Sequence, residues 1–450
     1  MALQRNHGEV RHLKLSVPTH AITHAIEDVI FTLYFFFAIF MPDIMPISTR
    51  ILLLMAQFLL ILWAVVSTKR FRISKRILKI LIAFAPFLIY FAYAQCLRVF
   101  FDKAQASIYL SASIETVKPL VYIFIQTFAT IALCKKFRVD LHRCIRLMIY
   151  AAVLQLLCVL LSLAVPSVRE TFLNLTIRYS KSDRMMMVTQ KAMNTDKRGY
   201  GFANNLFDSL GYIISMLITL TFLEGFASGK KRFILLSVVM LIIPAVNTRT
   251  GLILSFLGFF VVFCFYFDFR RIGSYLLGAA GVALLCLCAY SFLIPKTTQE
   301  FIEGGISDTT ELIQNQNSSG VYQQILQADI VFPSNMLLGS GASPENLEHY
   351  RGIDSGYIQF LWRFGIIGSL LLLGGEFFLF CVAWRCTKSR QAKCILVAFS
   401  AIILMYLFKL YSWTNTGAAF ILFTLPVVII LDGKKSRYAG DISLSGGRNE

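Results

Sequence analysis

The residues best suited to chemistry in this chain are an arginine between two threonines, Thr248-Arg249-Thr250, which separates two apolar runs. A guanidinium is permanently charged and can hold two phosphate oxygens at once. The two hydroxyls and the Asn247 amide would add hydrogen-bond donors around it. Because a charge at a membrane boundary is costly and usually has a task, the motif predicts a site for an anionic group. The alternative is an arginine that extends to lipid head groups.

A second candidate place is the run 197–205, where a basic segment enters the next apolar stretch. Arg198 supplies positive charge, and the following Gly199-Tyr200-Gly201 lets backbone approach a ligand closely. Asn204 and Asn205 could cap the helix and donate amide N–H groups, and a helix start itself attracts anions. The alternative is an ordinary loop-to-helix cap that contains an incidental arginine.

A third candidate place is the run 349–368, which closes a long acidic segment. Asp354 is a candidate general base or hydroxyl-orienting group, and the alternative is a plain helix N-cap. The helical spacing of Asp354 and Tyr357 puts both on one face. The candidates for binding substrate here are Arg351, Tyr357, Gln359 and His349.

Apolar stretches long enough to cross a hydrocarbon core of ~30 Å must position these residues. The composition, with 57% hydrophobic and 15% charged residues, requires lipid to cover part of the surface. We therefore expect an all-α, polytopic integral membrane protein with about twelve transmembrane helices in a single domain over 1–450. The predicted spans are 29–46, 51–67, 77–95, 117–134, 145–165, 206–225, 232–247, 251–267, 273–294, 361–384, 394–411 and 415–431.

Lysine and arginine gather in alternate connections, which fixes the expected orientation. The basic connections are 68–79, 134–146, 226–232, 268–272 and 385–393. By the positive-inside rule both termini, including the tail 432–450, are cytoplasmic. The net charge of +18 lies almost entirely on that side. It is explained by topology and by contact with anionic lipid, so nucleic acid is not an expected partner.

Two outward connections, 166–203 and 295–354, are too long to be simple turns. The first is net basic and the second net acidic, which predicts a cleft with walls of opposite charge, suited to an anionic group beside a polyhydroxyl ligand. The alternative is two solvated loops that attract each other. Within the second loop, 309–316 and 319–330 could form short helices, and Gly339-Ser340-Gly341 marks a turn.

These three places together resemble the O-antigen polymerase family, within the wider group that includes O-antigen ligases. The resemblance is carried by Arg198-Gly199-Tyr200-Gly201, Thr248-Arg249-Thr250-Gly251 and Asp354-Ser355-Gly356-Tyr357, in this order on one side. It implies a GT-C-like glycosyltransferase of the bacterial inner membrane that joins undecaprenyl-pyrophosphate-linked oligosaccharide repeat units at the periplasmic face. It also implies that Arg249 and Arg198 hold the lipid pyrophosphate. Asp354 stands where ligases usually have a histidine, which favours a polymerase.

The expected site uses no metal and no cofactor, because the chain contains no Asp-x-Asp motif and no His/Cys cluster with ligand spacing. The expected partners are the lipid-linked donor and acceptor, membrane lipid and a chain-length regulator. The alternatives are an O-antigen ligase, a lipid-linked oligosaccharide flippase and an inert scaffold. A flippase should carry charges near the bilayer midplane, whereas Glu376 and Lys409 are expected nearer a helix end than its centre.

Overall fold

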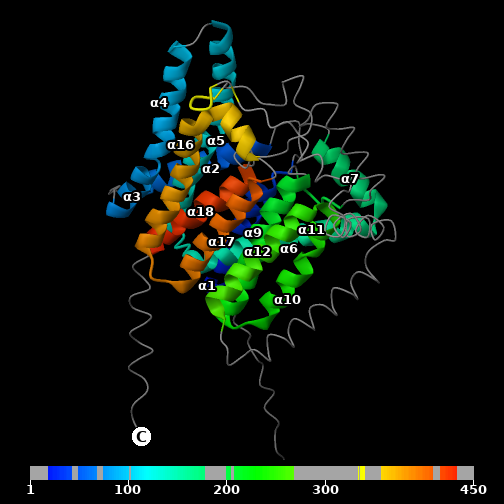
Figure 1. Cartoon of the computed structure of the whole chain (residues 1–450). Coiled ribbons are helices and arrows are strands. Elements are labelled where there is room, and N and C mark those ends of the chain that lie inside the picture. The colour runs from blue at the N-terminus through cyan, green and yellow to red at the C-terminus, as the bar shows by residue number, and fades with distance from the viewer. Residues whose placement is uncertain are drawn as a thin grey trace, which may run out of the picture.

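A computed structural model describes residues 19–42, 49–67, 74–100, 103–177, 199–203, 207–267, 333, 335–339, 356–408 and 416–432. Every regular element within these residues is an α-helix (Figure 1), so the all-α prediction is confirmed. The helices are α1 (Thr19–Phe40), α2 (Thr49–Val66), α3 (Lys75–Ala83), α4 (Ala85–Phe100), α5 (Lys103–Lys136), α6 (Leu141–Ala164), α7 (Pro166–Ile177), α9 (Phe207–Ser228), α10 (Lys231–Met240), α11 (Ile242–Asn247), α12 (Arg249–Tyr266), α16 (Gly356–Cys386), α17 (Arg390–Tyr406) and α18 (Thr416–Asp432).

Within the described residues, 6 helical segments are long and apolar enough to cross a membrane. They are Thr49–Val66, Lys75–Cys96, Leu141–Ala164, Asp208–Ser228, Arg249–Tyr266 and Gly356–Cys386. The α2 helix leaves large apolar side chains uncovered, among them Phe58, Leu59 and Val66. An apolar face of this kind needs lipid or a partner, so the chain has the character of a membrane protein. The total of twelve spans stays a prediction, and the ninth, 273–294, lies outside the described residues.

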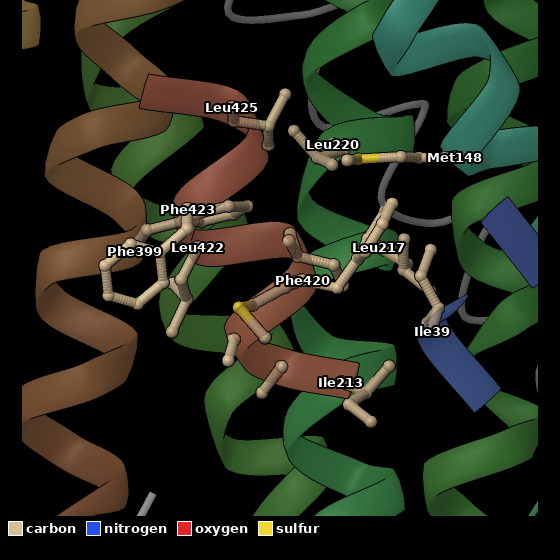
Figure 2. Close-up of a cluster of buried hydrophobic side chains, with 14 of the residues drawn as sticks. Ile39, Met148, Ile213, Leu217, Leu220, Phe399, Phe420, Leu422, Phe423 and Leu425 are labelled. Atoms are coloured by element: carbon tan, nitrogen blue, oxygen red, sulfur yellow. The ribbon is translucent and has the colours of Figure 1, made fainter. Parts of the chain in front are cut away.

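The centre of the bundle is α18, which is buried on all sides from Thr416 to Ile430. Its sequence is apolar all round, as expected for a helix enclosed by other helices. Figure 2 shows its side chains packed among those of α1, α6, α9 and α17. A polar contact fixes the register of α18 against α5. The Nε2 amide of buried Gln126 on α5 donates to the Phe420 carbonyl at 2.8 Å and to Thr424 Oγ1 at 2.9 Å.

Two of the predicted spans are interrupted, and a proline lies just beyond each interruption. The α3–α4 segment breaks at Phe84, two residues before Pro86, and the α10–α11 segment breaks at Leu241, three residues before Pro244. Proline has no N–H to donate and its ring collides with the carbonyl of the preceding turn. The second break sets the direction of α11, which leads directly into Thr248 and α12.

A third interruption lies inside α16 at Gly365, whose φ of 62° and ψ of −174° are not helical. The segment 335–339 fills this break. The N–H of Ile366 donates to the Met336 carbonyl at 2.9 Å, and the N–H of Ile367 donates to the Leu337 carbonyl at 3.2 Å. Any side chain at position 365 would meet backbone of the segment. Glycine is therefore required, and the hydrogen bonds satisfy N–H groups that the broken helix cannot.

The structure corrects two sequence predictions and adds a helix that the sequence analysis did not predict. The α1 helix covers Thr19–Phe40 instead of 29–46, since no proline interrupts the sequence between Pro18 and Pro42. The first outward loop begins with a helix, α7, because Pro166 at the first helical position is already set for helix. Finally, Glu376 lies nearer the centre of α16 than its end. Lys409, the two short helices expected within 295–354 and most of that loop lie outside the described residues.

Ion pairs gather at one end of the bundle. Arg143 of α6 pairs with Asp28 at 2.7 Å and with Glu27 at 3.2 Å, which ties α6 to α1. Fully buried Glu224 of α9 lies 3.2 Å from His142 Nδ1, and it accepts a hydrogen bond from Gln391 Nε2 at 3.1 Å. These contacts join α1, α6, α9 and α17 at the end where the basic connections 226–232 and 385–393 begin.

Candidate functional site

The helix α12 begins at the opposite end of the bundle from these ion pairs, with Arg249 as its first residue. The Arg249 side chain is exposed and that of Thr250 is half-buried. Thr248, the N-cap residue, has extended backbone and its side chain does not cap the helix. Its hydroxyl instead donates to Asp208 Oδ1 at 2.6 Å. The positive end of the α12 dipole therefore lies beside the Arg249 guanidinium without a side-chain cap, an arrangement that favours an anion.

A short irregular segment, residues 199–203, which we call the strap, lies against the end of α11 just before this helix start. The Asn247 side chain donates from Nδ2 to the Gly199 carbonyl at 2.7 Å and to the Ile243 carbonyl at 2.8 Å. Asn247 is only 1% exposed, so these hydrogen bonds form away from competing water. The strap thus brings two of the three predicted places together, because Gly199 is the residue after Arg198.

A second amide holds the strap from the other side. Gln155 of α6, which is fully buried, donates from Nε2 to the Tyr200 carbonyl at 2.8 Å. Gly201 has a φ of 63°, and a Cβ there would lie 2.8 Å from both Gln155 Nε2 and Val159 Cγ2. Only glycine combines a positive φ without strain and the absence of a Cβ, so position 201 requires it. The two glycines predicted to allow a ligand to approach are therefore explained, in the structure, by close contact with α6.

Close helix packing sets the distance between Asp208 and Thr248. Gly211 of α9 faces Gly251 of α12, and a Cβ on Gly251 would lie 2.7 Å from the Gly211 Cα. The two backbones can approach this closely because neither residue has a side chain. Asp208 was not among the residues singled out from the sequence. The sequence signal that could have identified Asp208 is a carboxylate in the first turn of an apolar stretch.

The third predicted place is described only in part. The Tyr357 hydroxyl donates to the Leu404 carbonyl at 2.8 Å, and its N–H donates to the Leu407 carbonyl at 3.1 Å. Tyr357 therefore fastens the start of α16 to the end of α17, and Gln359, two residues further on, is buried. Six candidate residues lie outside the described part of the chain: Arg198, Asn204, Asn205, His349, Arg351 and Asp354.

The site offers hydrogen-bond donors and positive charge, with one carboxylate at its edge. Among the described residues no group of three or more His, Cys, Asp or Glu side chains could hold a metal ion. The chemistry that Arg249, the α12 start and the strap can provide is the binding of an anion, with Asp208 close enough to orient a donor such as the Thr248 hydroxyl.

Comparison with known proteins does not assign the chain to a family. No protein-family model matches the chain, and no curated protein is significantly similar to it.

Proposed function

We propose that the protein is an O-antigen polymerase of the bacterial inner membrane, which joins undecaprenyl-pyrophosphate-linked oligosaccharide repeat units at the periplasmic face. The observation that carries the proposal is the exposed Arg249 at the uncapped start of α12, beside the strap that begins after Arg198. An exposed guanidinium at the positive end of a helix dipole suits a pyrophosphate better than a neutral ligand.

The orientation of the bundle supports a periplasmic site. The end opposite Arg249 carries the starts of α10 and α17 with their lysines and arginines, Lys230, Lys231, Arg232, Lys388, Arg390 and Lys393. Basic residues remain on the cytoplasmic side of bacterial membranes. The rim formed by Thr248, Arg249 and the strap would then face outward, where a polymerase meets its lipid-linked substrates.

In the proposed reaction a sugar hydroxyl of the acceptor attacks the anomeric carbon of the donor. The bond from that carbon to the pyrophosphate oxygen breaks, and undecaprenyl pyrophosphate leaves. Arg249 and Arg198 stabilise the negative charge that develops on the leaving group. Asp354 accepts the proton of the attacking hydroxyl. The sugar-binding and orienting residues of the proposal are Arg351, Tyr357, Gln359, His349, Asn204, Asn205, Thr248 and Thr250.

The test is a deletion strain complemented with variants and analysed as a lipopolysaccharide ladder. Arg249→Ala should keep a normal protein level but leave glycolipid with a single repeat, since removing one preorganised charge lowers a rate by ~10²–10³. Arg249→Lys should also be defective, because an ammonium cannot hold two oxygens. The matched control is Arg232→Ala, an exposed arginine at the basic end of the bundle. Long ladders from Arg249→Ala would refute the proposal.

Two observations favour a second candidate, a lipid-linked oligosaccharide flippase. The break in α16 at Gly365 and the buried Glu376 near the middle of that helix are features of transporters. The same ladder separates the candidates. A deletion that retains the single repeat indicates a polymerase, and a deletion that loses even this repeat indicates a flippase. Polymer that accumulates on its carrier without reaching lipid A indicates a ligase.

A further inference from the structure

Glu376 is an ionisable side chain in the interior of the bundle that the proposed glycan chemistry does not use. It lies about midway between the Gly365 break and Cys386 on α16, and it is 3% exposed. No lysine, arginine or histidine of the described residues forms an ion pair with it. A carboxylate at membrane depth without a cation is costly and usually marks an ion or proton pathway.

An ionisable group close to Glu376 is the hydroxyl of Tyr212 on α9. It is close enough to Glu376 for an electrostatic interaction. Tyr212 is fully buried, and its hydroxyl makes no hydrogen bond within the described part of the chain. A buried hydroxyl without a partner is rare and needs an explanation. A water molecule between this hydroxyl and the Glu376 carboxyl would satisfy both groups.

From Tyr212 the polar groups continue to the outer rim. The Tyr212 ring stacks on that of Tyr406 of α17, with centroids 4.0 Å apart and planes at 1°. Tyr406 shares a side-chain hydrogen bond with Ser209 and interacts electrostatically with Asp208. Asp208 and Ser209 are half-buried in the first turn of α9. The series thus runs from an accessible carboxylate at the rim to an enclosed carboxylate in the membrane interior.

Among the residues that the structure describes, the elements packed around Glu376 supply no cation at its depth. Besides α9, which carries Tyr212, the helices that pack against α16 include α3, α4, α17 and α18. The basic residues of α3 and α17 lie in the first two turns of those helices, at the basic end of the bundle, and Asp432 ends α18 there too. The ionisable side chains of these elements and of α16 that the structure describes are Lys75, Arg76, Lys79, Tyr90, Tyr93, Cys96, Tyr357, Arg363, Cys381, Arg385, Cys386, Arg390, Lys393, Cys394, Tyr406 and Asp432.

We propose that Glu376 is a proton-binding site that exchanges with the outer rim through Tyr212, Tyr406 and Asp208. A proton taken up at Asp208 passes along the two hydroxyls through bridging water, because the Tyr212 hydroxyl has no direct hydrogen bond to Tyr406 or Glu376. Each hydroxyl accepts one proton and releases one, so both tyrosines end unchanged. At Glu376 it converts the carboxylate to a neutral carboxylic acid, and the reverse sequence releases it. The ligand is the proton itself, and the inference does not depend on the identity of the glycan substrate.

The experiment is infrared spectroscopy of the whole protein reconstituted in lipid. Wild type should show the carbonyl stretch of a protonated carboxylic acid. The band should disappear in Glu376→Gln, fade as the pH is raised, and shift when the buffer is exchanged for deuterated buffer. Tyr212→Phe should keep the band but slow its exchange severalfold. The matched control is Glu224→Gln, which changes a buried glutamate held by a cation cluster and should leave the band in place.

Three results would overturn the proposal. One is the lack of any band that depends on residue 376, since Glu376 would then be ionised throughout. Another is a band that responds to neither pH nor deuterium, which indicates a purely structural acid. The third is exchange at an unchanged rate in Tyr212→Phe, a variant that keeps Glu376 and therefore remains informative if Glu376→Gln does not fold.

Discussion

The contact between α9 and α12 gives a quantitative prediction at Gly251. In Gly251→Ala the new methyl would lie 2.7 Å from the Gly211 Cα, 3.0 Å from the Pro244 Cβ and 3.0 Å from the Thr248 Cγ2. Carbon atoms in contact prefer a separation of about 3.5–4.0 Å, so α12 must move by about 1 Å. Overpacking of this kind typically costs about 1–3 kcal/mol. The movement would also lengthen the 2.6 Å hydrogen bond between Thr248 and Asp208.

The measurement is the melting temperature of the detergent-solubilised protein, followed by fluorescence-detected size exclusion after heating. Gly251→Ala should melt below wild type. Gly374→Ala is the matched control, because a Cβ at this helical position of α16 meets nothing within 4 Å. Replacing that glycine should raise stability by up to about 1 kcal/mol through helix propensity. If the melting temperature of Gly251→Ala equals or exceeds that of Gly374→Ala, the close contact between the backbones at Gly211 and Gly251 is refuted.

Three further substitutions test contacts described above. Asn247→Leu removes two buried hydrogen bonds and orphans the Gly199 carbonyl, so we expect a loss of about 1–3 kcal/mol and shortened polymer; unchanged polymer would show that the strap does not position the site. Arg143→Met removes two ion pairs of a mostly buried guanidinium and should lower the melting temperature, more at low salt than at high salt. Tyr357→Phe should cost about 0.5–1.5 kcal/mol, and retained ladders would assign that hydroxyl to helix fastening alone.

The sequence predicts helices well because hydrophobic runs and their flanking charges are local signals. The spans 145–165 and 415–431 correspond closely to α6 and α18. The break at Gly365 could not be predicted in this way, since its hydrogen-bond partners are Met336 and Leu337, which the chain brings back from a distant loop. Hydropathy averages over a window and does not detect such an insertion.

Some residues of the candidate site can likewise be predicted from the sequence and others cannot. Arg249 is recognisable from sequence because a charge between apolar runs stands out. Asp208 is not, because its role depends on Thr248, 40 residues further along the chain. Glu376 was expected nearer a helix end than its centre, whereas it lies nearer the centre of α16. Contacts between distant segments, and not local composition, decide these cases.

The central position of α18 has a consequence for biogenesis. The helix that fills the axis of the bundle leaves the ribosome after every other described helix, while its neighbours α1, α5 and α6 are inserted long before. The Gln126 side-chain amide has its hydrogen-bond acceptors on Phe420 and Thr424, which are synthesised 294 and 298 residues later. Until then the earlier helices surround an unfilled axis. Nascent chains that stop before residue 416 should therefore be substrates for membrane quality control, even though most of their helices are already inserted.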